Sequence, residues 1–205
     1  MNRRFYWQLG ATLFLVALVA ISAFTWLKPS RAPDEGLSIT LSATAPFALT
    51  ATDGRAVTDQ TYRGKIVLIY FGYTLCPDVC PTTLSNIAAA LAALGNDAAK
   101  VQALFVTVDP HRDTPKALAD YVKTFDPRIV GLSGTDEQIA AAAKRFGVYY
   151  KRYNSADFPD GYAMDHSAAT YVMDPRGRLV TLLTPDMTAE QMTARLEKLV
   201  GTAAS

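Results

Sequence analysis

Two cysteines are the residues of this sequence with the clearest capacity for chemistry. Cys76 and Cys80 are the only cysteines among 205 residues, and Pro77 lies between them. On a helix, residues i and i+4 share a face with Cβ atoms about 6 Å apart, whereas a disulfide needs Cβ atoms nearer ~3.8 Å. A partly unwound turn at Pro77 would let the sulfurs meet or hold an ion between them. The amino end of a following helix would favour thiolate, which suits a nucleophile and a metal ligand alike.

Residue type alone leaves several roles open for these cysteines. An isolated cysteine is often a small buried hydrophobe, and a structural disulfide would be normal outside the cytoplasm. The preceding Gly72-Tyr-Thr and the intervening Pro77 instead indicate a shaped loop tip. A redox-active dithiol and a metal site are therefore the two interpretations that the pattern favours.

A metal site needs further ligands, and the sequence contains two histidines, His111 and His166. Structural zinc normally takes four Cys and His ligands, so it would require both histidines, which we do not expect. Two thiolates and one imidazole suit copper better, since Cu(I) prefers thiolates and imidazole suits both oxidation states. His166 is the better placed because it precedes a buried strand, although a lone histidine is more often structural. Met164 could add a soft ligand, but packing is the simpler interpretation.

The elements that would position these side chains alternate between strand-like and helix-like patterns. The expected strands are an early hairpin near 47–50 and 57, buried runs at 65–70 and 101–108, and segments at 129–132, 148–153, 170–173 and 179–183. The expected helices are 81–94, 114–125, 133–146 and 188–200. This order predicts an α/β, thioredoxin-like fold with a central mixed sheet flanked by helices. The cysteines would lie where the first buried strand meets its helix.

Polar residues that follow the second buried strand complete the candidate site. Asp109 ends this strand, and the carboxyl ends of parallel strands line one edge of a sheet. We therefore expect Asp109 to orient a metal ligand or its loop by accepting a hydrogen bond, with a turn cap as the alternative. Arg112 and Asp113 are expected to pair locally, Asp113 to cap the next helix, and His111 to be a solvated loop residue.

The first 40 residues differ in character from the rest of the chain. Residues 9–27 contain no charged side chain, and as a helix they would rise roughly 28 Å, close to the ~30 Å hydrocarbon core of a bilayer. Arg3 and Arg4 precede this segment, which predicts an N-in, C-out anchor. A cleaved signal peptide is the alternative.

These features divide the chain into five expected parts. They are a short cytoplasmic N-terminus at 1–8, a transmembrane anchor at 9–27, a linker at 28–40, a thioredoxin-like copper-binding domain at 41–201, and a tail at 202–205. The anchor would be single-pass in the inner membrane. No Arg- and Ser-rich presequence precedes it, which favours a bacterial periplasm as the location of the domain.

Composition excludes two classes of function. The net charge is +1, and without a Lys- and Arg-rich run there is no electrostatic case for binding nucleic acid. Two cysteines cannot build the dense disulfide framework of a small secreted domain.

Motifs in three parts of the chain resemble the Sco/SenC family of membrane-anchored copper-binding factors for cytochrome c oxidase assembly. They are Tyr70-Phe-Gly-Tyr-Thr-Leu-Cys76-Pro-Asp-Val-Cys80-Pro-Thr-Thr, Val106-Thr-Val-Asp109-Pro-His-Arg-Asp113-Thr-Pro and Tyr162-Ala-Met-Asp165-His166-Ser. The resemblance covers the whole domain and the single anchor. It implies that Cys76, Cys80 and His166 bind one copper ion, as Cu(I) or Cu(II). It also implies that the protein delivers copper to, or reduces the thiols of, the binuclear CuA site in oxidase subunit II.

The same side chains allow functions of different classes. A copper chaperone passes its ion by ligand exchange and needs His166, whereas a thiol–disulfide oxidoreductase does not. Oxidation of the cysteines to a disulfide would remove both thiolates and release the metal. We expect a metallochaperone rather than an enzyme, with oxidase subunit II as partner beside another periplasmic copper carrier or a thiol reductant. A thiol peroxidase would need a single sensitised cysteine, which the pattern does not indicate.

Overall fold

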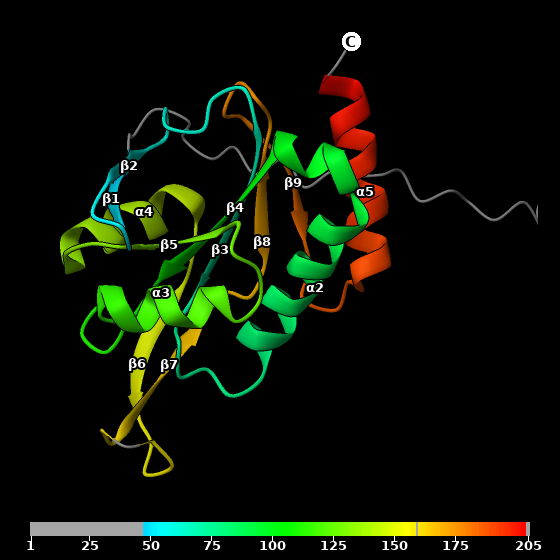
Figure 1. Cartoon of the computed structure of the whole chain (residues 1–205). Helices are drawn as coiled ribbons and strands as arrows, with labels where there is room; N and C mark the ends of the chain where they lie inside the picture. The colour runs from blue at the N-terminus through cyan, green and yellow to red at the C-terminus, as the bar shows by residue number, and fades with distance from the viewer. Residues whose placement is uncertain (1–46, 159, 204–205) are drawn as a thin grey trace, which may run out of the picture. The chain divides into compact units, whose positions relative to one another are not determined.

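The structure, a computed structural model, describes residues 47–158 and 160–203. It contains a seven-stranded sheet, a separate two-stranded sheet and helices that cover the larger sheet (Figure 1). The expected anchor at 9–27 and linker at 28–40 lie outside the described residues. Within the described ranges, no helix combines the length and the apolar character that a membrane crossing requires.

The elements follow the alternation that the sequence predicts. The strands are β1 Ala48–Ala51, β2 Ala56–Thr58, β3 Ile66–Gly72, β4 Val101–Thr107, β5 Ile129–Ser133, β6 Tyr150–Asn154, β7 Tyr162–His166, β8 Thr170–Met173 and β9 Leu179–Leu183. The helices are α2 Val79–Ala93, the short 3-10 helix η1 Gly95–Lys100, α3 Pro115–Lys123, α4 Asp136–Phe146 and α5 Ala189–Ala203.

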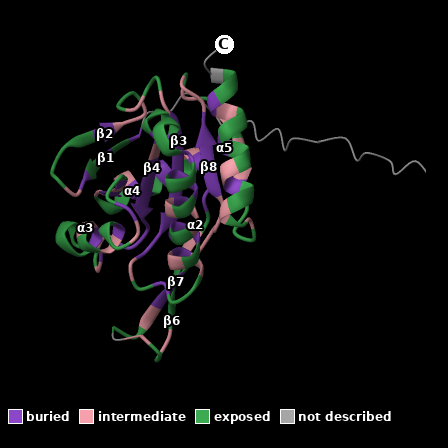
Figure 2. Cartoon of the chain, turned by 45° about the vertical axis from the view of Figure 1, so that its right-hand side comes forward, coloured by how far each residue is buried: buried purple, intermediate pink, exposed green. Residues whose placement is uncertain are grey.

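The larger sheet is mixed, as expected, and has the strand order β2-β1-β5-β4-β3-β8-β9. Strands β3, β4 and β5 run parallel, and β8 pairs antiparallel with the other edge of β3. All seven residues of β3 are buried, which is typical of a strand covered on both faces. Figure 2 shows buried residues concentrated in these central strands and exposed residues on the helices. The predicted thioredoxin-like arrangement of the domain is confirmed.

Aromatic contacts identify which helices cover which face of the sheet. Neighbouring residues of a strand point to opposite faces. The Tyr70 ring lies 6.0 Å from that of Phe105, which lies 5.6 Å from Tyr121 of α3. On the other face, the Phe71 ring lies 5.7 Å from that of Phe146 in α4. Even-numbered β3 residues such as Tyr70 therefore face α3, as well as Cys80 in α2, and odd-numbered ones face α4.

Helix boundaries are set by local capping, with one informative exception. The Thr114 hydroxyl accepts a hydrogen bond from the Ala117 amide at 3.2 Å, so Thr114 caps α3. Thr135 forms a complete capping box at the start of α4. Helix α2 has no side-chain cap, and it begins at Val79 rather than near 81. Cys80 therefore lies inside the first turn of α2, where backbone N–H groups lack partners within the helix.

The two-stranded sheet is the main departure from the predicted elements. The sequence indicates an extended segment at 148–153 followed by a polar loop, with His166 beyond it. In the structure, Tyr162–His166 forms the strand β7, which pairs antiparallel with β6 so that Tyr150 lies opposite His166. Figure 1 shows β6 and β7 at the end of the larger sheet where α2 begins. His166 is therefore held on a hairpin rather than on a loop.

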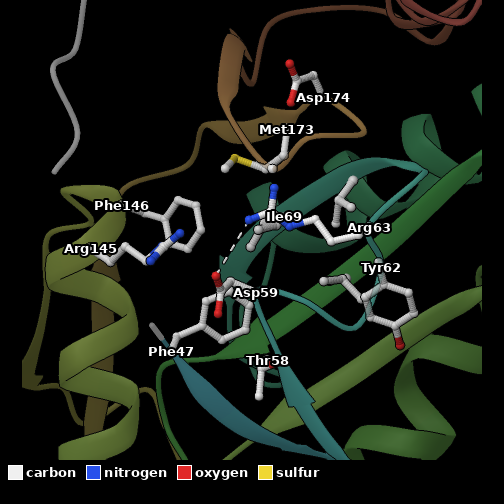
Figure 3. Close-up of a pocket in the computed structure, with 13 residues that line it drawn as sticks. Phe47, Thr58, Asp59, Tyr62, Arg63, Ile69, Arg145, Phe146, Met173 and Asp174 are labelled. Atoms are coloured by element: carbon white, nitrogen blue, oxygen red, sulfur yellow. Dashed lines mark ion pairs between the residues drawn. The ribbon is translucent and has the colours of Figure 1, made fainter. Parts of the chain in front are cut away.

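An apolar pocket on the α4 face of β3 is separate from the cysteines. Its lining includes Phe47, Ile69, Phe146 and Met173, with the Arg63 guanidinium 3.9 Å from the Asp59 carboxylate (Figure 3). The free space is about 30 Å³, which is enough for one or two water molecules. We assign this pocket to packing.

Candidate metal centre

The cysteine loop joins the end of β3 to the start of α2. Cys76 lies before the helix, and its amide donates a hydrogen bond to the Tyr73 carbonyl at 3.2 Å. The Cys80 amide donates to Cys76 Sγ at 3.4 Å. The Cys76 sulfur therefore takes the place of the side-chain cap that α2 lacks. The Cys80 N–H group and the positive end of the helix both stabilise negative charge on this sulfur.

Both cysteines are free thiols in the structure and both are buried. Cys76 is 9% exposed and Cys80 is fully buried. The close approach of Cys80 to the sheet depends on Gly72, because a Cβ added there would lie 2.7 Å from Cys80 Sγ. Cys76 is thus the sulfur with access to solvent, and Cys80 is the inner one.

His166 ends β7 and brings an imidazole to the cysteines. Its Nε2 lies 3.4 Å from Cys80 Sγ, and its Nδ1 lies 3.0 Å from the Ser167 carbonyl oxygen. A carbonyl oxygen can only accept, so Nδ1 carries the proton in the neutral ring. Nε2 therefore directs its lone pair at the sulfurs, and the Ser167 contact fixes the ring in the orientation of a metal ligand.

The three donor atoms converge into a single group. Cys76 Sγ, Cys80 Sγ and a ring nitrogen of His166 all lie within 4.8 Å of one another. Among the described residues, this is the one group of three Cys, His, Asp or Glu side chains close enough to share a metal ion. The structure therefore brings together the three side chains that the family resemblance implies as ligands.

The environment separates the acidities of the two thiols. A hydrogen bond from the Cys80 side chain, assisted by backbone amides, lowers the pKa of Cys76 to about 4 despite partial burial. The Cys76 thiolate and burial together raise the pKa of Cys80 well above its usual range. Without metal, near neutral pH, Cys76 is a thiolate and Cys80 keeps its proton. A metal that binds both sulfurs must displace that proton.

Asp109 contacts the site through an intermediary. It is 1% exposed, its carboxylate forms an ion pair with Arg112, and it accepts a hydrogen bond from the Tyr162 hydroxyl at 3.0 Å. Arg112 Nη1 donates to the Tyr162 carbonyl at 2.9 Å. Tyr162 begins β7, which ends at His166. The geometry therefore fits the expectation that Asp109 orients the segment that carries His166, because it contacts Tyr162 both directly and by way of Arg112.

Aromatic rings link the same arginine to His166. The Arg112 guanidinium lies 3.7 Å from the centre of the Tyr162 ring and 5.7 Å from that of Tyr73. The Tyr73 ring in turn meets the His166 ring edge-on at 5.9 Å. Burial raises the pKa of Tyr73 to about 12, so this ring stays neutral beside the imidazole.

Asp113 has a role that the sequence analysis missed. It neither caps α3 nor pairs with Arg112. Its carboxylate accepts hydrogen bonds from the Thr74 amide at 3.1 Å, the Thr74 hydroxyl at 2.5 Å and the Thr107 hydroxyl at 2.6 Å. Asp113 therefore fixes the loop that carries Cys76 to the end of β4. Burial raises the pKa of this carboxyl against the lowering effect of these donors.

The two remaining candidate residues, His111 and Met164, lie as the sequence predicts. His111 is exposed and contacts Asp136 at 3.0 Å. It is absent from the metal-binding group, so the described Cys and His residues do not provide a four-ligand zinc site. Met164 is buried in β7, in agreement with packing.

Comparisons with known proteins support one family. A family model described as SCO1/SenC matches residues 38–201. Protein SenC of Rhodobacter capsulatus is 37% identical over 201 residues, which cover 93% of this chain and 90% of that protein.

Two solved structures extend this similarity to the fold. The structure of Bradyrhizobium japonicum ScoI with copper bound has a TM-score of 0.69 and 46% identity, and covers 75% of this chain and 97% of that one. The crystal structure of Arabidopsis thaliana ScoI with copper bound has a TM-score of 0.72 and 35% identity, and covers 77% and 97%.

Proposed function

The chain belongs to the SCO1/SenC family, and from this membership we propose that it carries one copper ion to cytochrome c oxidase during oxidase assembly. The copper is cargo, and Cys76, Cys80 and His166 are its ligands. The observation that carries the proposal is the convergence of these three donor atoms within 4.8 Å. The related proteins of Bradyrhizobium and Arabidopsis have been solved with copper bound.

The chemistry of the donor set supports copper over other metals. Two thiolates are soft ligands that favour Cu(I), and a neutral imidazole serves both copper oxidation states. Burial of the sulfurs shields the ion from water, while the 9% exposure of Cys76 leaves one ligand within reach of an incoming protein. Such a site can hold copper and release it by exchange of one ligand at a time.

The recipient in this proposal is the CuA site of oxidase subunit II. The anchor proposed for 9–27 would hold the domain at the periplasmic face of the inner membrane, where that site is assembled. This assignment comes from the family resemblance of the motifs and not from the geometry of the site. A copper carrier or a thiol reductant of the same compartment would supply the ion or keep the cysteines reduced.

A second candidate function is thiol–disulfide exchange with a protein partner. The lowered pKa of Cys76, about 4, favours it, because the thiolate is the attacking species. Cys76 Sγ would attack a partner disulfide, forming a mixed disulfide and releasing one partner thiolate. Cys80 would lose its proton and attack Cys76 Sγ, which releases the second partner thiolate. Two electrons pass to the partner, and a thiol reductant must restore the cysteines.

A copper titration distinguishes the two functions. The full-length chain, reduced and purified in detergent, is expected to bind one copper ion per chain. His166→Ala, Cys76→Ser and Cys80→Ser should each abolish tight binding, whereas His111→Ala, which alters an exposed histidine outside the site, should not. If His166→Ala binds copper like the wild type and keeps thiol–disulfide activity, the carrier proposal is wrong.

A further inference from the structure

A buried phenol contacts the inner sulfur of the site. Tyr70, in the middle of β3, is fully buried, and its hydroxyl donates to Cys80 Sγ at 3.6 Å. Within the described part of the chain, this is the only hydrogen bond of the Tyr70 hydroxyl. The Thr83 hydroxyl also lies beside this phenol, but it has no hydrogen-bond partner among the described residues, so Cys80 Sγ is the acceptor of the Tyr70 proton.

The same ring also contacts the imidazole ligand. The Tyr70 ring meets the His166 ring at 6.2 Å with an interplanar angle of 73°. On another side it packs against the Phe105 ring at 6.0 Å. Tyr70 therefore contacts two of the three ligands from the sheet, and its position is fixed by the core rather than by a loop.

The two sulfurs receive different hydrogen bonds. Cys76 Sγ accepts from the backbone amide of Cys80, which any residue at position 80 except proline would supply. Cys80 Sγ accepts from a side chain, so its environment depends on the residue at position 70. A substitution at position 70 can therefore remove the hydrogen bond to Cys80 Sγ without changing any of the three ligands.

A hydrogen bond to a thiolate changes how strongly it donates to copper. The donated proton withdraws electron density from sulfur, and Cu(II) depends on that density more than Cu(I) does. Hydrogen bonding around a cysteine sulfur is accordingly one of the means by which proteins tune copper redox potentials. Cys80 is fully buried. If the Tyr70 hydroxyl were removed, no water molecule would replace its hydrogen bond to Cys80 Sγ.

We propose that Tyr70 is a positioning residue that biases the site toward Cu(I) by donating a hydrogen bond to Cys80 Sγ. This inference rests on the proposed function, because it assumes that copper occupies the three ligands. The inference adds to the proposed function a residue, Tyr70, that affects the oxidation state of the bound copper. A carrier that holds Cu(I) leaves its own thiolates unoxidised, since Cu(II) can take an electron from sulfur.

The test compares Tyr70→Phe with the wild type in the reduced, full-length chain under anaerobic conditions. Cu(I) and Cu(II) affinities are each measured by competition with a chelator specific for that ion. The ratio of Cu(I) to Cu(II) affinity is expected to fall on the order of tenfold, or about 59 mV for a one-electron couple. The sulfur-to-Cu(II) charge-transfer band should move to longer wavelength, because the sulfur becomes a stronger donor.

Tyr121→Phe is the matched control. The Tyr121 hydroxyl is buried without a hydrogen-bond partner among the described residues, so its removal deletes a phenol oxygen and no hydrogen bond. The control should leave both the affinity ratio and the band unchanged. If Tyr70→Phe fails to fold, fluorotyrosine at position 70 replaces it. A fluorinated phenol donates more strongly, so the ratio and the band should then move in the opposite direction.

The possible outcomes distinguish a failure of the role of Tyr70 from a failure of the proposed copper-carrier function. A wild-type chain that binds no copper overturns both. A wild type that binds copper, with Tyr70→Phe giving the same ratio and the same band, overturns the role of Tyr70 alone. Equal shifts in Tyr70→Phe and Tyr121→Phe also overturn it, because the effect would then be one of core packing.

Discussion

Cys80 Sγ and His166 Nε2 lie 3.4 Å apart although 86 positions separate the two residues in sequence. Two different structural devices bring them together. The first turn of α2 places the sulfur against β3, and the pairing of β7 with β6 places the imidazole at the end of the larger sheet. Each device can therefore be disturbed separately by substitution.

The unequal acidity of the two thiols predicts unequal alkylation. Cys76 has a pKa lowered to about 4, so it should be a thiolate throughout the neutral range, whereas Cys80 is buried with a raised pKa. Iodoacetamide at pH 6 should therefore modify Cys76 and spare Cys80 in the metal-free, reduced chain, as measured by peptide mass mapping. In denaturant the two should react alike. Faster modification of Cys80 in the folded chain would contradict this prediction.

Gly72→Ala tests the close approach of α2 to the sheet. The added Cβ would lie 2.7 Å from Cys80 Sγ and 2.8 Å from a ring carbon of Phe105. Overpacking of this kind costs about 1–3 kcal/mol of stability, and displacement of Cys80 should weaken copper binding as well. Gly201→Ala is the control, since nothing lies within 4 Å of its added Cβ. Thermal unfolding and copper competition measure the two effects, and wild-type behaviour of Gly72→Ala would refute the tight contact.

The central strands and the cysteine loop could be predicted from sequence because their signals are local. The apolar run of β3 is continuous and ends where the cysteines begin, and Thr114-Pro115 marks the start of α3 with a cap and a proline. Such patterns depend on burial and on neighbouring residues alone.

The second strand of the hairpin and its supports could not be predicted because their signals are not local. The segment expected at 148–153 contains most of β6, but the two buried residues of β7 are adjacent, so β7 lacks the apolar alternation by which a half-buried strand is recognised. Asp113 follows Arg112 and precedes a helix cap, which suggests pairing or capping. Its actual partners, Thr74 and Thr107, are identified only once the chain has folded.

Asp113→Ala should loosen the loop that carries Cys76. The substitution leaves the Thr74 amide and the hydroxyls of Thr74 and Thr107 without their acceptor, at a cost of about 1–3 kcal/mol for each buried group left unpaired. We expect lower thermal stability and weaker copper binding, with faster proteolysis near residue 74. Asp120→Ala removes an exposed carboxylate and its pair with Lys116, which solvent screens, so the loss should be small. Equal losses in the two variants would argue against a specific role for Asp113.

Arg112→Lys tests whether the Asp109–Arg112 pair positions the histidine ligand. Lysine keeps a positive charge beside the buried Asp109 but loses the planar group that stacks on Tyr162 and donates to its carbonyl. Supports of this kind typically contribute about 10–100-fold to metal affinity, so copper affinity should fall by that order. Alkylation of Cys76 should stay at the wild-type rate, because the cysteine loop is held separately by Asp113. Arg55→Lys, in an exposed pair with Asp53, should change neither quantity. Slower or faster alkylation in Arg112→Lys would mean that the arginine acts on the whole site rather than on the hairpin that carries His166.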